Sequence, residues 1–163
     1  MTSADADRLR RAYELFNAGS VDWSIFDPAV RNDHTAGLFL DGVFYGTEGV
    51  RAAFEEIATD WDDVQLEPEE VIDLGGSYLV LVHMRARVRG SDAQLDAQIA
   101  HVWEFRDGRV VAWDVYGDRA TAMKAISATD GFKRNRTAQP SAPPPVRADD
   151  PPAEPHGPRA PLV

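Results

Sequence analysis

The sequence predicts an α+β domain in which a curved antiparallel sheet holds helices against one face. Apolar residues recur with helical spacing before Asp62 and alternate with polar residues after it. Helical segments that precede a run of long strands are typical of this class. The chain has 163 residues, of which 44% are hydrophobic and 27% charged, so it can bury the core of one soluble domain.

Three helices are expected in the first part of the chain. The first begins near Ser3 and ends at Gly19. Its buried stripe consists of Leu9, Ala12, Tyr13 and Phe16. A short second helix in VDWSIFDP ends before Pro28. The third helix, in TEGVRAAFEEIATDW, has an apolar face made of Val50, Ala53, Phe54 and Ile57.

Strands are expected after Asp62. They lie in VQLEPEEVIDL, in SYLVLVHMRARV and in the two halves of QIAHVWEFRDGRVVAWDVYGD, before a final helix in DRATAMKAI. Pro68 cannot donate a backbone hydrogen bond, which places its strand at an edge of the sheet or at a bulge.

The strand SYLVLVHMRARV shows which of its two faces is buried. The inward row consists of Tyr78, Val80, Val82, Met84, Ala86 and Val88. The opposite row, which includes His83 and three arginines, faces solvent or a second subunit.

The turn RDG decides where His101 points, because the register of a hairpin follows from its turn. A two-residue turn at Asp107-Gly108 would pair His101 with Asp114 and divide the apolar residues between both faces. A three-residue turn with Gly108 at positive φ pairs His101 with Trp113 instead. It keeps an inward row of Ala97, Ile99, His101, Trp103, Phe105, Val111, Trp113 and Val115. Each buried apolar side chain contributes about 1.5–3 kcal/mol, against about 1 kcal/mol for one His–Asp contact, so the three-residue turn is predicted.

Charge and composition exclude several functions. The net charge of −10 argues against nucleic acid and anionic membranes as partners, because both need a basic footprint. The absence of cysteine excludes disulfides and a cysteine nucleophile. The histidines lack metal-ligand spacing and no glycine-rich phosphate loop opens a helix, so neither a metal nor another cofactor is expected. The N-terminus has no long apolar run, which favours a cytoplasmic protein.

Residues 133–163 differ in composition from the rest of the chain. They hold nine of the eleven prolines and no aromatic residue. Such a segment buries too little apolar surface to offset its ordering entropy. We therefore expect one domain over residues 1–132 and a disordered proline-rich tail over residues 133–163, with PPP as an alternative ligand for a proline-binding groove.

Four segments together carry a family resemblance. They are RRAYELFNAG, FDPAVRNDHTAG, FYGTEGVRAAFEEI and IAHVWEFRDGRVVAWDVYGDRATAMKAI, which together span residues 10–126. In this order they resemble the SnoaL-like branch of the nuclear-transport-factor-2-like superfamily. The resemblance implies a cone-shaped α+β barrel with a deep pocket, paired into a homodimer through the outer face of its sheet. The superfamily includes ketosteroid isomerases, polyketide cyclases and limonene-epoxide hydrolases, as well as proteins that only bind or assemble.

The resemblance to ketosteroid isomerases implies three catalytic residues. Tyr13 occupies the place of an oxyanion-hole tyrosine, Asp33 that of the general base, and His101 that of a protonated aspartic acid. Around a hydrophobic pocket, the ligand-binding residues would be Phe16, His34, Val82, Met84, Trp103, Trp113 and Val115. The epoxide-hydrolase pattern is not matched, because apolar residues stand where that family keeps its Arg and Asp residues.

Each catalytic candidate also has a structural alternative. Tyr13 and His101 could satisfy each other in a packed core, Asp33 could cap a turn, and His34 could orient Asp33 or lie in an ordinary loop. The first functional hypothesis is a cofactor-independent isomerase or cyclase that moves a proton next to a carbonyl of an apolar small molecule, with Asp33 as base. The second is a non-catalytic ligand-binding or dimerisation module, which is favoured if the tryptophans and Phe16 plug the cone.

Overall fold

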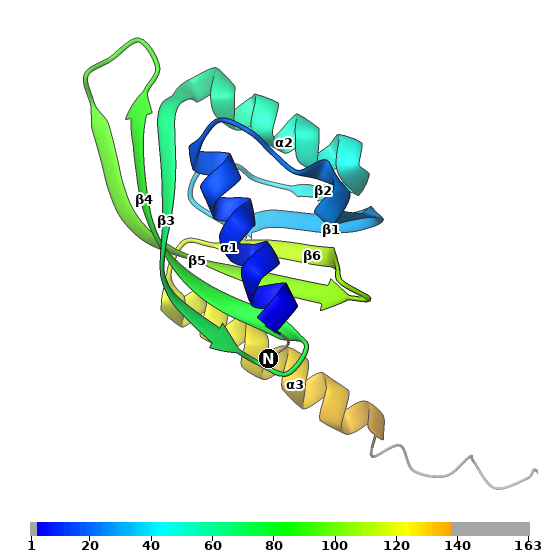
Figure 1. The fold of residues 1–163 in the computed structure, drawn as a ribbon. Helices are drawn as coiled ribbons and strands as arrows, with labels where there is room; N and C mark the ends of the chain where they lie inside the picture. The colour runs from blue at the N-terminus through cyan, green and yellow to red at the C-terminus, as the bar shows by residue number, and fades with distance from the viewer. Residues whose placement is uncertain (1–2, 138–163) are drawn as a thin grey trace, which may run out of the picture.

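A curved six-stranded sheet with helices on both faces forms the fold (Figure 1). The computed structural model describes residues 3–137. Its elements are α1 (Ser3–Asn17), the 3₁₀ turn η1 (Trp23–Ile25), β1 (Phe26–Ala36), β2 (Val43–Tyr45), α2 (Gly46–Asp60), β3 (Trp61–Asp73), β4 (Ser77–Val88), β5 (Gln94–Arg106), β6 (Arg109–Tyr116) and α3 (Arg119–Thr137). None of the helices in this part of the chain is long and apolar enough to cross a membrane.

The sheet has the strand order β2-β1-β6-β5-β4-β3. All neighbouring pairs are antiparallel except β1 and β6, which run parallel. The predicted α+β class is confirmed, although the sheet is mixed rather than wholly antiparallel. Pro68 lies in the edge strand β3, next to a register shift between Pro68 and Glu70, as expected for a residue without a backbone donor.

Two clusters of buried side chains lie on opposite faces of the sheet. The larger one fills the concave side, which we call the cone, and includes residues of α1, α2 and five strands. The smaller one consists of Leu79, Ala100 and Ala122 beneath α3. Leu79 lies on the predicted outward row of β4, yet it is fully buried because α3 covers that end of the outer face (Figure 1).

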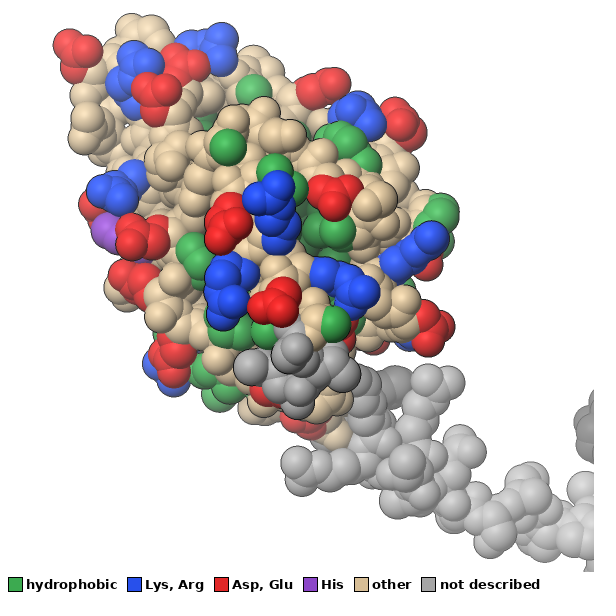
Figure 2. Space-filling view, viewed as in Figure 1, with side chains coloured by type: hydrophobic (Ala, Val, Ile, Leu, Met, Phe, Trp, Pro, Cys, Tyr) green, Lys and Arg blue, Asp and Glu red, His purple; other side chains and the backbone are tan. Residues whose placement is uncertain are grey.

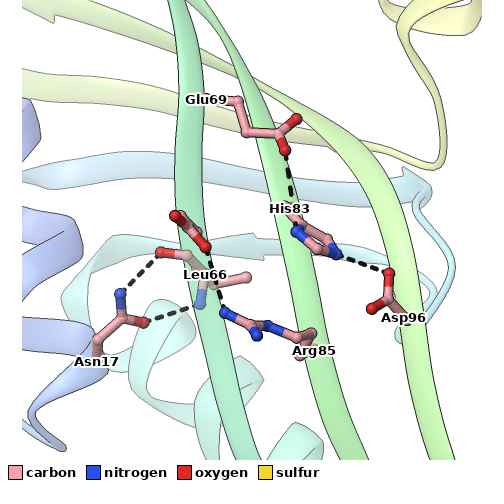
Figure 3. Close-up of polar contacts among 7 residues, drawn as sticks. Asn17, Leu66, Glu69, His83, Arg85 and Asp96 are labelled. Carbon is pink, nitrogen blue, oxygen red and sulfur yellow. Dashed lines mark hydrogen bonds and ion pairs between the residues drawn. The ribbon is translucent and has the colours of Figure 1, made fainter.

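The C-terminal end of α1 is fixed to the edge strand. Gly19 adopts a φ of 78°, and the amides of Gly19 and Ser20 donate to the carbonyls of Phe16 and Leu15, which ends the helix as predicted. Asn17 then bridges to β3: its Nδ2 donates to the Leu66 carbonyl at 2.8 Å, and its Oδ1 accepts from the Leu66 amide at 2.8 Å (Figure 3). The amide side chain thus replaces the missing neighbour strand at one edge position.

Removing this bridge is expected to destabilise the fold. Asn17→Ala leaves the partly buried amide and carbonyl of Leu66 without their partner, which should lower the free energy of unfolding by about 1–3 kcal/mol. Urea denaturation measures the change. Gln65→Ala is the matched control, because it removes only an exposed hydrogen bond to the Asn17 carbonyl beside the bridge and should lose less. Equal losses in both variants would contradict the bridging role.

The strand β1 was not expected from the sequence. The short helix predicted at residues 21–28 is only the 3₁₀ turn η1, and the chain is already extended at Phe26. Its inward positions include Val30, Asn32 and His34, all buried. Because two of these three are polar, β1 lacks the apolar alternation by which a strand is recognised.

The predicted three-residue turn of the hairpin was wrong, but the predicted inward face of its strands was correct. Asp107 and Gly108 form a two-residue turn with φ angles of 52° and 75°, the conformation of a type I′ turn. A register shift after Phe105 and Val110 then brings Trp103 opposite Trp113 and His101 opposite Val115. This bulge keeps the apolar row together, with Val110 rather than Val111 in the core. His101 and both tryptophans therefore point inward, as predicted.

The predicted domain boundary lies close to the end of the described chain. Helix α3 runs from Arg119 to Thr137, five residues past the expected end of the domain at residue 132. The proline-rich segment expected to form a tail lies, beyond Thr137, outside the described residues.

Candidate functional site

A buried chain of hydrogen bonds joins α1 to β5 inside the cone. Trp103 Nε1 donates to Tyr13 Oη at 3.0 Å, and Tyr13 Oη lies 2.8 Å from His101 Nδ1. Because the tyrosine oxygen accepts from the indole, its own proton is available for His101 Nδ1. The network is satisfied when Tyr13 donates to His101, which leaves the imidazole proton on Nε2.

Burial keeps the hydrogen-bonded side chains of Tyr13 and His101 uncharged. Tyr13 and His101 are 4% and 2% exposed. Burial raises the pKa of the Tyr13 phenol. Burial, together with the nearby His34, lowers the pKa of His101 to about 3. At neutral pH the interior thus holds a neutral imidazole and a neutral phenol.

A second polar pair comes from β1. His34 Nε2 lies 2.8 Å from Asn32 Oδ1, and Asn32 Nδ2 donates to the Trp113 carbonyl at 2.8 Å. Since the amide oxygen only accepts, His34 donates through Nε2. Burial lowers the pKa of His34 to about 4, against a smaller raising effect of Asp33. His34 is therefore also neutral at pH 7.

Aromatic side chains fill most of the cone. Trp103 and Trp113 stack with ring centroids 4.4 Å apart, and Trp113 also contacts Phe26, Phe54 and His101. The remaining space lined by Tyr13, Phe16 and both tryptophans is about 20 Å³. That is room for one water molecule. In this structure the cone is plugged, not open to a ligand of several rings.

One polar atom inside the cone is left over. Trp113 Nε1 is buried and has no acceptor among the described residues. A buried N–H without an acceptor costs about 1–3 kcal/mol, so it is unusual in a well-packed core. Because the indole of Trp113 lines the small cavity, a carbonyl or hydroxyl placed beside it could accept this bond.

Asp33 does not join the other two catalytic candidates. Its neighbours Asn32 and His34 point inward, so the alternation of β1 turns Asp33 to the outer face. There its Oδ1 accepts from the amide and hydroxyl of Thr35 at 2.9 and 2.7 Å. The expectation of a carboxylate in the pocket is thus wrong: Tyr13 and His101 are brought together and Asp33 is kept apart.

The remaining predicted pocket residues are all near the cone. Val82, Met84 and Val115 are buried in its apolar wall, with Trp103 and Trp113. Phe16 is half-buried and packs against Phe54 with ring centroids 5.3 Å apart. His34 contacts Trp113 from the side of β1.

An open groove adjoins the cone and was not expected from the sequence. It has a volume of about 500 Å³, and its walls come from the end of α1, η1, α2 and the start of β3. The apolar part of this aromatic groove consists of Phe16, Val21, Trp23, Phe54, Ile57, Trp61 and Val64. The Arg51 guanidinium lies 4.2 Å from the Trp23 ring at its rim. Phe16, Val21 and Phe54 line both the groove and the small cavity, so they separate the two.

Figure 2 shows both signs of charge interspersed with small apolar patches on the face where α1 lies. On the outer face of the sheet the charges are paired: His83 Nε2 lies 2.6 Å from Asp96, and Arg85 bonds Glu67 at 3.2 Å (Figure 3).

Comparison with known proteins agrees with this fold. The SnoaL-like domain family matches residues 9–113. An NTF2-like protein of unknown function from Burkholderia pseudomallei is 25% identical, with a TM-score of 0.63 over 76% of this chain and 97% of that one. TerC, co-crystallised with polyporic acid, is 20% identical, with a TM-score of 0.62 over 77% of this chain and 99% of that one.

A more distant structure has the same fold. A protein with a ketosteroid isomerase-like fold from Catenulispora acidiphila, in complex with trimethylamine, is 13% identical, with a TM-score of 0.56 over 71% of this chain and 86% of that one. No curated protein is similar enough to count as a match. The family match covers more than half of the sequence, and the solved structures named above share the fold. The chain belongs to the SnoaL-like domain family.

Proposed function

We propose that the protein binds an apolar small molecule that carries a hydrogen-bond acceptor. The ligand enters from the aromatic groove and displaces Phe16 and Phe54 to reach the cone. The observation that carries this proposal is the buried Nε1 of Trp113, which has no acceptor among the described residues and belongs to a side chain that lines the small cavity. A ligand carbonyl would accept from this indole, while the aromatic walls would bury the apolar remainder.

The separating residues are suited to move. Phe16 and Phe54 are only half-buried and contact each other. Phe54 also contacts Trp23 and Trp113 through its ring, and these contacts involve no hydrogen bond. Rotating them away from the boundary would connect the aromatic groove, of about 500 Å³, to the cone without breaking a hydrogen bond. Two structural neighbours contain small molecules, polyporic acid and trimethylamine, which supports ligand binding as a use of this fold.

Binding is better supported than isomerisation or cyclisation. Proton transfer next to a carbonyl needs a base that reaches the ligand, and Asp33 lies on the outer face. The inward-facing bases are the imidazoles of His34 and His101, whose pKa values of about 4 and 3 make them weak. Tyr13 and His101 are proposed here as polar groups at the base of the ligand site.

We also propose that the protein forms a homodimer through the outer face of the sheet. That face carries paired charges around His83 and Arg85, and α3 covers its other end. Two copies meeting there would bury polar groups, so the contact would be hydrated and sensitive to salt.

Binding can be tested by screening the purified full chain against carbonyl-bearing aromatic compounds, with quenching of tryptophan fluorescence as the signal. Phe16→Ala removes the separating ring and is expected to tighten binding by about tenfold, because the ligand no longer displaces it. Ala12→Phe adds a ring to the lining of the small cavity and should abolish binding.

Leu38→Ala is the matched control, since this exposed side chain lies apart from the cone and the groove. Compounds that bind Ala12→Phe as tightly as the unaltered chain would place their site elsewhere and refute the proposal.

A further inference from the structure

A second cavity lies on the face of the sheet opposite the cone. It has a volume of about 370 Å³, in the range of small-molecule sites. Its floor is made by outward residues of β5 and β6, its wall by α3, and its rim by the turn between β3 and β4. We call it the α3 cavity. The proposed ligand site lies on the other face of the sheet, and the charged pairs around His83 and Arg85, where a homodimer was proposed, do not line this cavity.

The carboxylate of Asp114 is the chemically distinctive group of the α3 cavity. Asp114 lies between Val102 of β5 and Asp33 of β1 in the sheet register. Its Oδ2 accepts from Arg31 Nη2 at 2.5 Å. Its Oδ1 is buried and has no donor among residues 3–137. The side chain is only 15% exposed, so Oδ1 is largely shielded from solvent while it accepts no hydrogen bond from a described residue.

The groups around Asp114 leave the cavity acidic. Glu104 and Asp130 also line it, and Arg31 is the cation among its lining residues. Asp33 lies next to Asp114 on β1, and Glu104 is additionally paired with Arg106 at 3.6 Å. Tyr116 adds a phenol from β6. With Asp33 and Arg106 included, four carboxylates stand against two guanidiniums, which favours a positively charged ligand over an anion.

The rest of the α3 cavity is apolar. Val102, Ala112, Ala125 and Ile126 supply aliphatic surface from three elements. A metal ion would make no use of this surface, and no cluster of three metal-ligating side chains occurs within the described chain. We infer that the α3 cavity binds an organic ammonium ion, whose N–H donates to Asp114 and whose hydrocarbon part packs against α3.

The affinity of the α3 cavity for an ammonium ion should depend on pH. Burial raises the pKa of Asp114 to about 6, against the lowering effect of Arg31, while Asp33 and Glu104 raise it further. The ammonium ion binds the ionised carboxylate, so affinity falls as the pH drops through this value. Between pH 7.5 and pH 5 the ionised fraction, and with it the affinity, should fall about tenfold.

The experiment titrates the isotope-labelled full chain with cyclohexylamine and follows the amide resonances by NMR. Shifts are expected on β5, on β6 and in the middle of α3. The neutral isostere cyclohexanol should bind about tenfold more weakly at pH 7.5, because it lacks the charge-assisted hydrogen bond. Asp114→Asn should bring the affinity for cyclohexylamine down to that for cyclohexanol.

Two further variants keep the outcome interpretable. Ala125→Phe fills the cavity from α3 without changing Asp114 and should abolish binding of both compounds. Glu67→Gln removes an equal charge from the same face of the sheet, outside the cavity, and should change the affinity less than about twofold. Equal affinity for amine and alcohol, unchanged binding by Asp114→Asn, or no shifts near α3 would each overturn the inference. Shifts confined to the aromatic groove would also overturn it, while leaving the proposed function intact.

Discussion

Lowering the pH from 7.5 to 5 is expected to reduce the free energy of unfolding by about 3 kcal/mol, chiefly through two buried histidines. His34 and His101 have pKa values of about 4 and 3 in the fold, well below the ordinary value of 6.5. Between pH 7.5 and 5 the two histidines therefore bind protons in the unfolded chain but remain neutral in the folded chain. Each histidine accounts for a loss of about 2 kcal/mol.

A third group opposes this trend. The pKa of Asp114 is raised to about 6, so the folded chain binds a proton there before the unfolded chain does. This adds about 1 kcal/mol of stability as the pH falls through 6. The sum of the three groups is the expected net loss, and urea denaturation at several pH values between 7.5 and 5 measures it.

The source of the loss can be located by substitution. His101→Gln keeps an acceptor for Tyr13 without titrating, so its loss between pH 7.5 and 5 should be about 2 kcal/mol smaller than that of the unaltered chain. His34→Gln should show a reduction of similar size. A His101→Gln curve parallel to that of the unaltered chain would show that His101 is not held neutral by its burial.

The strands with regular alternation were predictable from the sequence, and so was the inward direction of His101. Strong apolar rows fix which face of β4, β5 and β6 is buried, because a shift of one residue would expose several large side chains. The same reasoning found the correct face of the hairpin with the wrong turn. The extra residue of the hairpin was expected in its turn. In the structure the extra residue forms a bulge in β6, which has the same effect on the direction of the side chains.

The position of Asp33 could not be found in the same way. Asn32 and His34 face the core because they bond to each other and to the Trp113 carbonyl, and this partner comes from a strand distant in sequence. Without that contact, NDHT has the composition of a turn. Glu104 and Asp114 share the outer face of the β5–β6 hairpin, but Arg31 joins them only through the parallel pairing of β1 with β6, which the sequence did not reveal.

Tyr13→Phe is expected to lower the free energy of unfolding by about 2–4 kcal/mol while leaving the shape of the core unchanged. The hydroxyl is at once the acceptor for Trp103 Nε1 and the donor to His101 Nδ1. Its removal leaves two buried polar atoms without partners, and each costs about 1–3 kcal/mol. Urea denaturation at pH 7.5 measures the loss, and Tyr78→Phe provides a comparison at another buried tyrosine of the cone.

A double variant separates the hydrogen bond from the packing. In Tyr13→Phe with His101→Leu, the imidazole no longer needs a partner, so the combined loss should be smaller than the sum of the two single losses by about 1 kcal/mol or more. Strict additivity would mean that Tyr13 and His101 act independently, despite the 2.8 Å between their polar atoms. In that case the hydrogen bond between Tyr13 and His101 would not contribute to the proposed ligand site. Trp113 Nε1 would remain as the hydrogen-bond donor to the ligand.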